Sequence, residues 1–361
     1  MNVRHCCTVI LCAIVAMLVT RSAAAQDAQR EPPQSTTATA PVRGIYNWIH
    51  TSGDAELAFE FYRHVFGIEL APSPFYGDPN VRPSGIRPVS EAGSDELVWD
   101  LTNTHGARFR TAFLSATNTP FGLELAEFFD IPRNTRAGQP WDPGASMLIF
   151  AVRDLASILA RARDLDAPIV TRDGAPLDTP LGRSIVMRNP DGYLIQAVQA
   201  RPEAIAASAA GAVIGTSIGI TVADTASAMA FYRDLLGFEI AATRTATDAE
   251  LPLYGLTNGA LVHTEARIPG TDVRVVFSEF TLAAGSQQSA NPFQWRIQDV
   301  GAPQFQLQVA GLDALLDRTR QAGYRFLSVD GRPIPRPFGR FVFAIDPDGV
   351  LVEYVEPQTS R

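Results

Sequence analysis

Apolar and polar residues along this chain follow two periods, one typical of strands and one typical of helices. Residues 217–222 alternate at every second position, as a half-buried strand does. Between Asp224 and Gly237 the apolar residues fall on one helical face, with Asp224 placed to cap the helix and Gly237 to end it. Strand, helix and further strands follow one another repeatedly, which predicts an α+β fold. Other predicted strands are 45–51, 109–115, 123–128, 147–152, 193–198, 273–280, 304–309, 341–345 and 350–355, and other predicted helices are 55–66, 155–165 and 312–322.

The chain contains an internal repeat. Residues 61–63 and 231–233 both read Phe-Tyr-Arg, and Gly and Glu follow each at the same spacing. Asn-Pro-Asp-Gly at 189–192 and Asp-Pro-Asp-Gly at 346–349 form a second pair of matching segments in the same order. Two ordered matches indicate two copies of one module. The predicted bounds are 42–200 for the first module, 201–212 for an Ala-rich linker and 213–358 for the second module, with a Pro/Gly-rich lid or rim loop at 71–96.

The N-terminal segment has the layout of a secretory signal peptide. A positive charge at Arg4 precedes a short apolar run, and Ala23-Ala24-Ala25 supplies a small-residue cleavage site. We therefore expect residues 1–25 to be a signal peptide and residues 26–41, rich in Gln, Thr, Ala and Pro, to be a disordered tether. The mature protein is expected in the periplasm or secreted, with no membrane contact after cleavage, and an uncleaved membrane anchor is the alternative.

Composition narrows the chemistry that this chain can perform. The cysteines are Cys6, Cys7 and Cys12, all within the predicted signal peptide, and the sequence has no lysine. Thiol nucleophiles, cysteine metal sites and Schiff-base lysines are thereby excluded from the mature chain. The net charge of −8 becomes −10 when the signal peptide, which carries Arg4 and Arg21, is removed. An acidic protein is repelled by phosphate backbones, so no nucleic-acid partner is expected.

The two copies resemble the vicinal-oxygen-chelate superfamily of glyoxalases, bleomycin-resistance proteins and extradiol dioxygenases. The segments that carry this resemblance are the opening at 220–239, with its counterpart at 61–69, and the endings at 346–356 and 189–199. The resemblance implies that each module contains paired βαβββ units that curl into an open cup around a small organic molecule. Because tandem modules can pair within one chain, either a monomer or a homodimer is compatible with it.

The resemblance also implies a divalent metal on the cup floor, held by His or Glu side chains from four strands. By strand register, these positions are Asn47, Glu124, Met147 and Gln196 in the first module, and Ser217, Val276, Gln304 and Glu353 in the second. None is a histidine, and one carboxylate remains in each module. We therefore expect no bound metal and no other cofactor. The alternative is a displaced ligand set, such as Glu353 with His263, for Fe, Mn, Ni or Zn.

Several other polar residues need a placement. Gln304, Gln306 and Gln308 share one strand face, and we expect their amides to point into the second cup, towards Glu353 and Ser217. The first cup, with Asn47, Met147, Ile149 and Gln196, is expected to be drier. Ser217 also lies in a Gly-x-Ser-x-Gly pattern, but within a predicted strand, where a hydrolase nucleophile elbow is not expected. His50 is expected to be structural and His64 to be solvated.

Three functional hypotheses remain from the sequence, in this order. The first is a metal-free protein that binds a small organic ligand through Asn47, Glu124, Gln196, Ser217, Gln304, Gln306, Gln308 and Glu353. The second is a metal-dependent lyase, isomerase or dioxygenase of the superfamily. The third is a metal-free enzyme in which Glu353 or Glu124 acts as a general base, because a carboxylate enclosed without a cation has a raised pKa.

Overall fold

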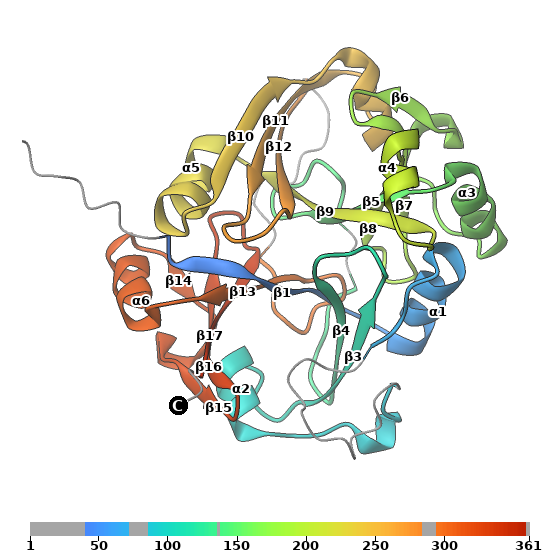
Figure 1. Cartoon of the computed structure of the whole chain (residues 1–361). Helices are drawn as coiled ribbons and strands as arrows, with labels where there is room; N and C mark the ends of the chain where they lie inside the picture. Colours follow the sequence, from blue (N-terminus) through green and yellow to red (C-terminus); the bar gives the residue numbers. More distant parts are fainter. Residues whose placement is uncertain (1–39, 72–85, 136–137, 284–293, 359–361) are drawn as a thin grey trace, which may run out of the picture. The chain divides into compact units, whose positions relative to one another are not determined.

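Most strands of the chain belong to two curled sheets that lie side by side (Figure 1). The structure is a computed structural model and describes residues 40–71, 86–135, 138–283 and 294–358. These residues form one compact unit. The predicted signal peptide, nearly all of the tether and most of the predicted insertion lie outside the described residues. Within the described part of the chain, no helix is long and apolar enough to cross a membrane.

Sheet A has the strand order β14-β16-β17-β13-β1-β4-β3-β2, with β15 paired to β16, and sheet B has the order β10-β11-β12-β9-β5-β8-β7-β6. The first module contributes to sheet A the strands β1 (Val42–Thr51), β2 (Glu69–Leu70), β3 (Arg108–Ser115) and β4 (Gly122–Phe129). The second module contributes to it β13 (Pro303–Val309), β14 (Arg325–Phe326), β15 (Ile334–Arg336), β16 (Gly339–Ile345) and β17 (Leu351–Pro357). Sheet B contains β5 (Ser146–Val152), β6 (Leu177–Thr179), β7 (Gly182–Arg188) and β8 (Leu194–Gln199) of the first module, and β9 (Val213–Val222), β10 (Glu239–Thr245), β11 (Gly259–Arg267) and β12 (Arg274–Leu282) of the second.

The two modules exchange halves, so that neither forms a sheet by itself. Strand β1 runs antiparallel to β13, with Asn47 opposite Gln306. Strand β5 likewise runs antiparallel to β9, with Ile149 opposite Ser217. The predicted α+β fold with two open cups is confirmed, but each cup joins one half of the first module to one half of the second. One cup, called cup A below, is the concave face of sheet A, and cup B is the concave face of sheet B.

Helices cover the outer faces of both sheets and begin and end where the sequence predicts. Helix α1 (Ala55–Phe66) is capped by the Asp54 carboxylate, which accepts a hydrogen bond from the Leu57 N–H, and ends at Gly67 with φ of 65°. The other covering helices are α3 (Leu155–Asp164), α5 (Thr225–Met229), its π-helical continuation η3 (Ala230–Leu235), and α6 (Leu312–Gln321). Figure 1 shows α1 near α3 at one end and α5 near α6 at the other. Their buried faces and the outer sheet faces form one core, which includes Trp48, Tyr62, Phe66, Phe150, Phe231, Tyr232 and Phe305.

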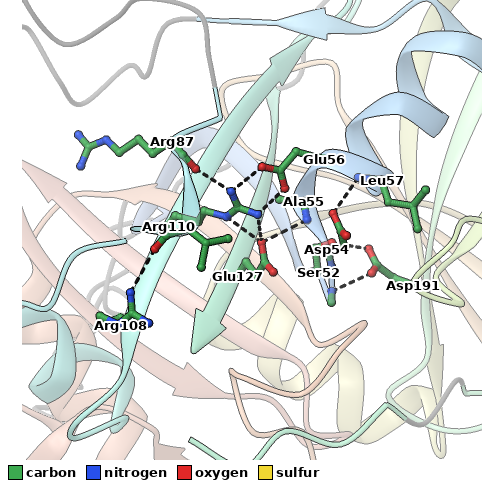
Figure 2. Close-up of polar contacts among 12 residues, drawn as sticks. Ser52, Asp54, Ala55, Glu56, Leu57, Arg87, Arg108, Arg110, Glu127 and Asp191 are labelled. Carbon is green, nitrogen blue, oxygen red and sulfur yellow. Dashed lines mark hydrogen bonds and ion pairs between the residues drawn. The ribbon is translucent and has the colours of Figure 1, made fainter. Parts of the chain in front are cut away.

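A buried ion cluster joins α1 to the outer face of sheet A (Figure 2). The Arg110 guanidinium on β3 donates to the Glu127 carboxylate of β4 at 2.8 Å and to the Glu56 carboxylate of α1 at 2.7 Å. Glu127 also accepts the Ala55 N–H at the start of α1. Glu124 lies on the same strand, β4, but residues on a strand alternate between faces, so its side chain is on the opposite face from Glu127. The cluster thus holds in place the strand that carries Glu124.

The sequence patterns did not predict three of the short helices. Helix α4 (Pro202–Ala207) lies within the predicted linker. Helix α2 (Glu96–Thr102) begins at the end of the predicted insertion, and η4 (Asp248–Tyr254) lies between β10 and β11. Because α2 lies between β2 and β3, α2 and η4 occupy equivalent places in the two modules. The remaining short turns of helix are η1 (Val89–Glu91), η2 (Arg172–Gly174) and η5 (Val329–Gly331).

Candidate functional site

Cup A contains a cavity of about 120 Å³ that opens to solvent. Successive residues of a strand point to opposite faces of the sheet, so every second residue points into the cup, for example Phe109, Thr111 and Phe113 of β3. The walls are mainly aromatic and comprise Phe109, Phe113, Phe128, Phe338, Phe341 and Phe343, with Ile49, Val98, Leu101, Ala126 and Ile297 between them. The polar floor comprises Glu124, Gln304, Gln306 and Glu353. An apolar pocket with a few convergent polar groups is the usual form of a small-molecule site.

Both surviving carboxylates lie in this one cup. Glu124 is on β4 of the first module, Glu353 is on β17 of the second, and both are buried. The expectation of one carboxylate in each cup is therefore wrong, because it assumed that each module closes on itself. Half-exchange instead gives cup A two carboxyl groups, while the corresponding positions of cup B are Val276 and Gln196.

Two amide side chains link the carboxyl groups across the floor. The Asn47 Nδ2 donates to Glu124 Oε2 at 3.3 Å and to Gln306 Oε1 at 2.9 Å. The Gln306 Nε2 in turn donates to Glu353 Oε2 at 2.6 Å. Gln304 is turned to a different partner, because its Nε2 donates to Thr51 Oγ1 at 3.1 Å. The result is a continuous chain of hydrogen bonds from Glu124 to Glu353.

Burial makes both carboxyl groups hard to ionise. It raises the pKa of Glu353 to about 7, despite the hydrogen bond from Gln306 and the nearby charge of Arg336. Burial also raises the pKa of Glu124 well above its usual range, and repulsion from Glu353 adds to that effect. The raised pKa that the sequence predicts for Glu353 is thus found, and the pKa of Glu124 is raised as well.

The rim of cup A is formed by helix α2, which is attached to the second module by polar contacts. Arg336 on β15 lines the cavity, and its Nη1 donates to Asp95 Oδ2 at 2.7 Å. Asp95 also caps α2. A second ion pair joins Arg332 to Asp100 at 2.8 Å, outside the cavity lining. These contacts hold one wall of the cup in place.

Cup B is filled by its own side chains. Helix η4 inserts Leu251, Leu253 and Tyr254, which pack with Met147, Ile149, Val186, Leu194, Val276 and Phe280 into a separate buried cluster. The remaining cavity is about 10 Å³, at most enough for one water molecule. The drier cup expected from Met147, Ile149 and Gln196 is found here, although Asn47 belongs to the other cup.

The remaining predicted residues are distributed over both sheets. Ser217 lies in the middle of β9 in sheet B, so the amides of Gln304 and Gln306 do not face it, and its Gly-x-Ser-x-Gly pattern is not at a strand-to-helix turn. Gln308 shares the strand face of Gln306 but lies opposite Gly44, outside the lining of the cavity.

No histidine of the described residues lines the cavity of cup A. His50 is buried on the outer face, stacked on Tyr193 with ring centroids 4.5 Å apart and bonded through Nε2 to the Tyr62 hydroxyl, as expected for a structural residue. His64 is exposed on α1, as expected. His263 lines cup B and contacts the Ser278 hydroxyl, whereas Glu353 lines cup A. These two residues therefore do not form the displaced ligand set considered from the sequence.

The donors in cup A fit poorly with the tightly held metal that the family implies. Metal ions in proteins are usually bound by His, Cys, Asp or Glu side chains. Of these types, the lining of the cavity contains Glu124 and Glu353. Across the described ranges, no group of three or more such side chains is placed to hold an ion. The amides of Asn47 and Gln306 direct N–H groups at the carboxylates, where a metal would require oxygen lone pairs.

Sequence reasoning missed Arg336, helix α2 and most of the phenylalanine wall. Arg336 lies in a short strand within a Pro- and Gly-containing segment that has no alternating pattern. The phenylalanines had a usable signal, because Phe109 and Phe113 alternate with Arg110 and Leu114 on a predicted strand. That alternation places them on the face opposite the helix, which is the cup.

Comparisons with known proteins agree with this architecture. Residues 216–354 match the Glyoxalase/Bleomycin resistance protein/Dioxygenase superfamily. Glyoxalase I from Zea mays is similar in structure, with a TM-score of 0.54 at 16% sequence identity over 86% of this chain and 92% of that one. A putative dioxygenase from Bacillus subtilis subsp. subtilis str. 168 has a TM-score of 0.51 at 11% identity over 89% of this chain and 87% of that one. No curated protein is matched by sequence. Residues 216–354 therefore match the superfamily that the repeated segments indicated, and most of the chain shares the fold of these two solved structures.

Proposed function

We propose that this protein binds a small, largely apolar organic molecule in cup A, without a tightly held metal ion. The observation that carries the proposal is the difference between its two cups. Cup A keeps a cavity of about 120 Å³ above two buried carboxyl groups, whereas cup B is filled by η4. Burial of polar groups costs free energy, and an open cavity gives no packing energy in return. The arrangement in cup A therefore favours a binding role over a purely structural one.

The chemistry of the walls indicates the kind of molecule. Six phenylalanines can surround an apolar or aromatic group, and the carboxyl and amide groups of the floor can form hydrogen bonds with it. Burial of an aromatic group contributes most of the binding energy in such pockets, while the few polar contacts fix its orientation.

Two measurements on the mature chain test this proposal. Elemental analysis after purification without chelators or a His-tag is expected to give well under one equivalent of any divalent metal. Benzyl alcohol, a neutral aromatic probe, is expected to perturb NMR signals of residues around cup A in a saturable way. Ala126→Leu, which fills cup A, should remove this binding, and Leu181→Phe at the rim of cup B should not. Stoichiometric metal, or binding that persists in Ala126→Leu, would contradict the proposal.

A second function is favoured by one specific observation, the pKa of about 7 for Glu353. A carboxyl group that titrates near neutral pH is suited to act as a general base. In that case a substrate with an acidic C–H bond would bind in cup A and lose its proton to Glu353. Turnover would then follow a pH–rate profile with a limb near pH 7, and that limb would be lost in Glu353→Gln.

We also propose that the mature protein acts outside the cytoplasm. The support is the charge, apolar run and small residues of the first 25 positions. N-terminal sequencing of the protein recovered from a periplasmic fraction should begin at Gln26. A chain that begins at Met1 in the cytoplasmic fraction would refute this.

A further inference from the structure

We propose, as a refinement that rests on the function above, that cup A takes an organic ammonium ion. The charged nitrogen lies between Glu124 and Glu353, and the apolar remainder contacts the phenylalanine walls. Three features of the cup support this inference: the hydrogen bonds that its carboxylates still need, its charge balance and its aromatic lining.

The first feature is the incomplete hydrogen bonding of the two carboxyl groups. An ionised carboxylate has about four lone-pair sites. Within the described residues, Glu124 accepts one hydrogen bond, from Asn47, and Glu353 accepts one, from Gln306. Both bonds go to the Oε2 atoms, which leaves each Oε1 for a ligand in the cavity that both residues line. A primary ammonium group has three N–H donors, enough to reach both carboxylates at once.

The second feature is the charge around the cavity. The charged residues that line it are Glu124, Glu353 and Arg336. Arg336 is already paired with Asp95, which lies 2.7 Å from its Nη1. Asp95 offsets part of the charge of this arginine, and the two carboxyl groups, which the amides of Asn47 and Gln306 link, repel each other when both are ionised. A ligand that brings a positive charge relieves this repulsion, whereas a carboxylate ligand would add to it.

The third feature is the aromatic wall. The faces of phenylalanine rings carry negative electrostatic potential and attract cations, most strongly where water is excluded. The six rings that line cup A would therefore stabilise an ammonium ion as it leaves water. They also supply apolar surface for the carbon skeleton of the ligand, which a hydrated inorganic cation does not need.

The test compares two probes of similar shape, benzylammonium and benzyl alcohol, by calorimetry at pH 8 on the full mature chain. Benzylammonium should bind about ten- to a hundredfold more tightly, the usual range for hydrogen bonds to a buried charge. In the double variant Glu124→Gln/Glu353→Gln this preference should disappear while benzyl alcohol still binds. Glu265→Gln, which removes a carboxylate lining cup B, should leave the preference unchanged.

One further variant is expected to gain affinity, which loss of folding cannot imitate, and a matched variant serves as its control. Arg336→Gln removes the cation nearest to Glu353 and one contact of α2, and should tighten benzylammonium binding several-fold. Arg332→Gln removes the other ion pair of α2 without changing the charge of the cavity lining, and should have no such effect. Weaker binding in Arg336→Gln than in Arg332→Gln would overturn the inference.

The outcomes separate this inference from the proposed function. Equal or tighter binding of benzyl alcohol would overturn the ammonium inference and leave the proposed function intact. Absence of binding for both probes would overturn both proposals. Tighter binding of Mn²⁺ than of benzylammonium, lost in the same double variant, would show that the carboxylates select a metal ion and would also overturn the inference.

Discussion

Burial of the Glu353 carboxyl group disfavours its ionised form, and the contacts with Gln306 and Arg336 only partly offset this effect. The group is buried and accepts a single hydrogen bond, and its pKa is raised from 4.5 to about 7. Between these two values the folded protein retains a proton that the unfolded chain has lost. Stability linked to this group therefore falls as the pH rises through that window and stays low above pH 7.

Glu353→Gln should remove this pH dependence. At pH 8 we expect the variant to be more stable than the wild type, with a free energy of unfolding about 1–3 kcal/mol higher, and at pH 5 we expect little difference. Urea denaturation of the variant and the wild type at both pH values measures this difference in the free energy of unfolding.

A matched control on the same strand has the opposite sign. Burial acts to raise the pKa of Glu356, but the N–H of Leu312, the Arg340 side chain and the N–H of Gly311 together lower it. Glu356→Gln should therefore destabilise the protein at pH 8, and the effect should shrink as the pH falls below 4.5. Equal behaviour of the two variants would contradict the account.

Arg110 and Arg108 offer a second comparison between neighbouring residues. Arg110 is buried between Glu127 and Glu56 (Figure 2), whereas Arg108 forms an exposed pair with Asp130. Arg110→Val leaves Glu127 buried without its cation and should destabilise the fold by about 3–5 kcal/mol. Arg108→Val should change little, because exposed ion pairs are screened by water. Chemical denaturation of both variants checks this, and similar losses would show that burial is not the cause.

At the scale of elements, the periodic segments were predictable and the short irregular ones were not. Helix α1 begins and ends where the pattern from Asp54 to Gly67 places it. Helices α2 and η4 were missed, because seven residues give too few turns for an apolar period to be recognised. Yet these two helices decide which cup is open.

The two short helices should differ in their response to truncation. Leu251 of η4 is packed inside the filled cup B, so Leu251→Ala leaves a new void and should cost about 2–5 kcal/mol. Leu101 of α2 already faces a cavity, and Leu101→Ala should cost less than half as much. Thermal or urea unfolding compares them. A larger loss for Leu101→Ala would mean that cup A is more tightly packed than described here.

At the scale of the molecule, the repeat could be read from the sequence, but its pairing could not. Each βαβββ unit presents a similar first strand, and β1 has the same alternation whether it pairs with β5 or with β13. Nothing local distinguishes the two arrangements, because the choice depends on contacts between segments about 260 residues apart. For this reason the carboxylates at positions 124 and 353 were recognised one by one, but their meeting in one cup was not.

An engineered disulfide in residues 26–361 tests the exchange of halves directly, since these residues contain no cysteine. A Cβ placed at Gly215 would lie 3.6 Å from the Cβ of Ala151, within the range of disulfide geometry. Ala151→Cys with Gly215→Cys should therefore cross-link on mild oxidation. Gly44→Cys with Ala151→Cys, which would meet only if β1 paired with β5, should not. Thiol titration and electrophoresis without reductant read out both pairs, and the reverse result would refute the exchanged pairing.

The exchange of halves also affects how such a protein can diverge after gene duplication. Each cup is composed of the beginning of one copy and the end of the other, so neither copy can be lost or specialised alone. The polar floor of the open cup depends on Glu124, encoded in the first copy, and on Glu353, encoded in the second. Recombination between the two copies would separate them, so selection for the proposed binding function would also preserve the difference between the repeats.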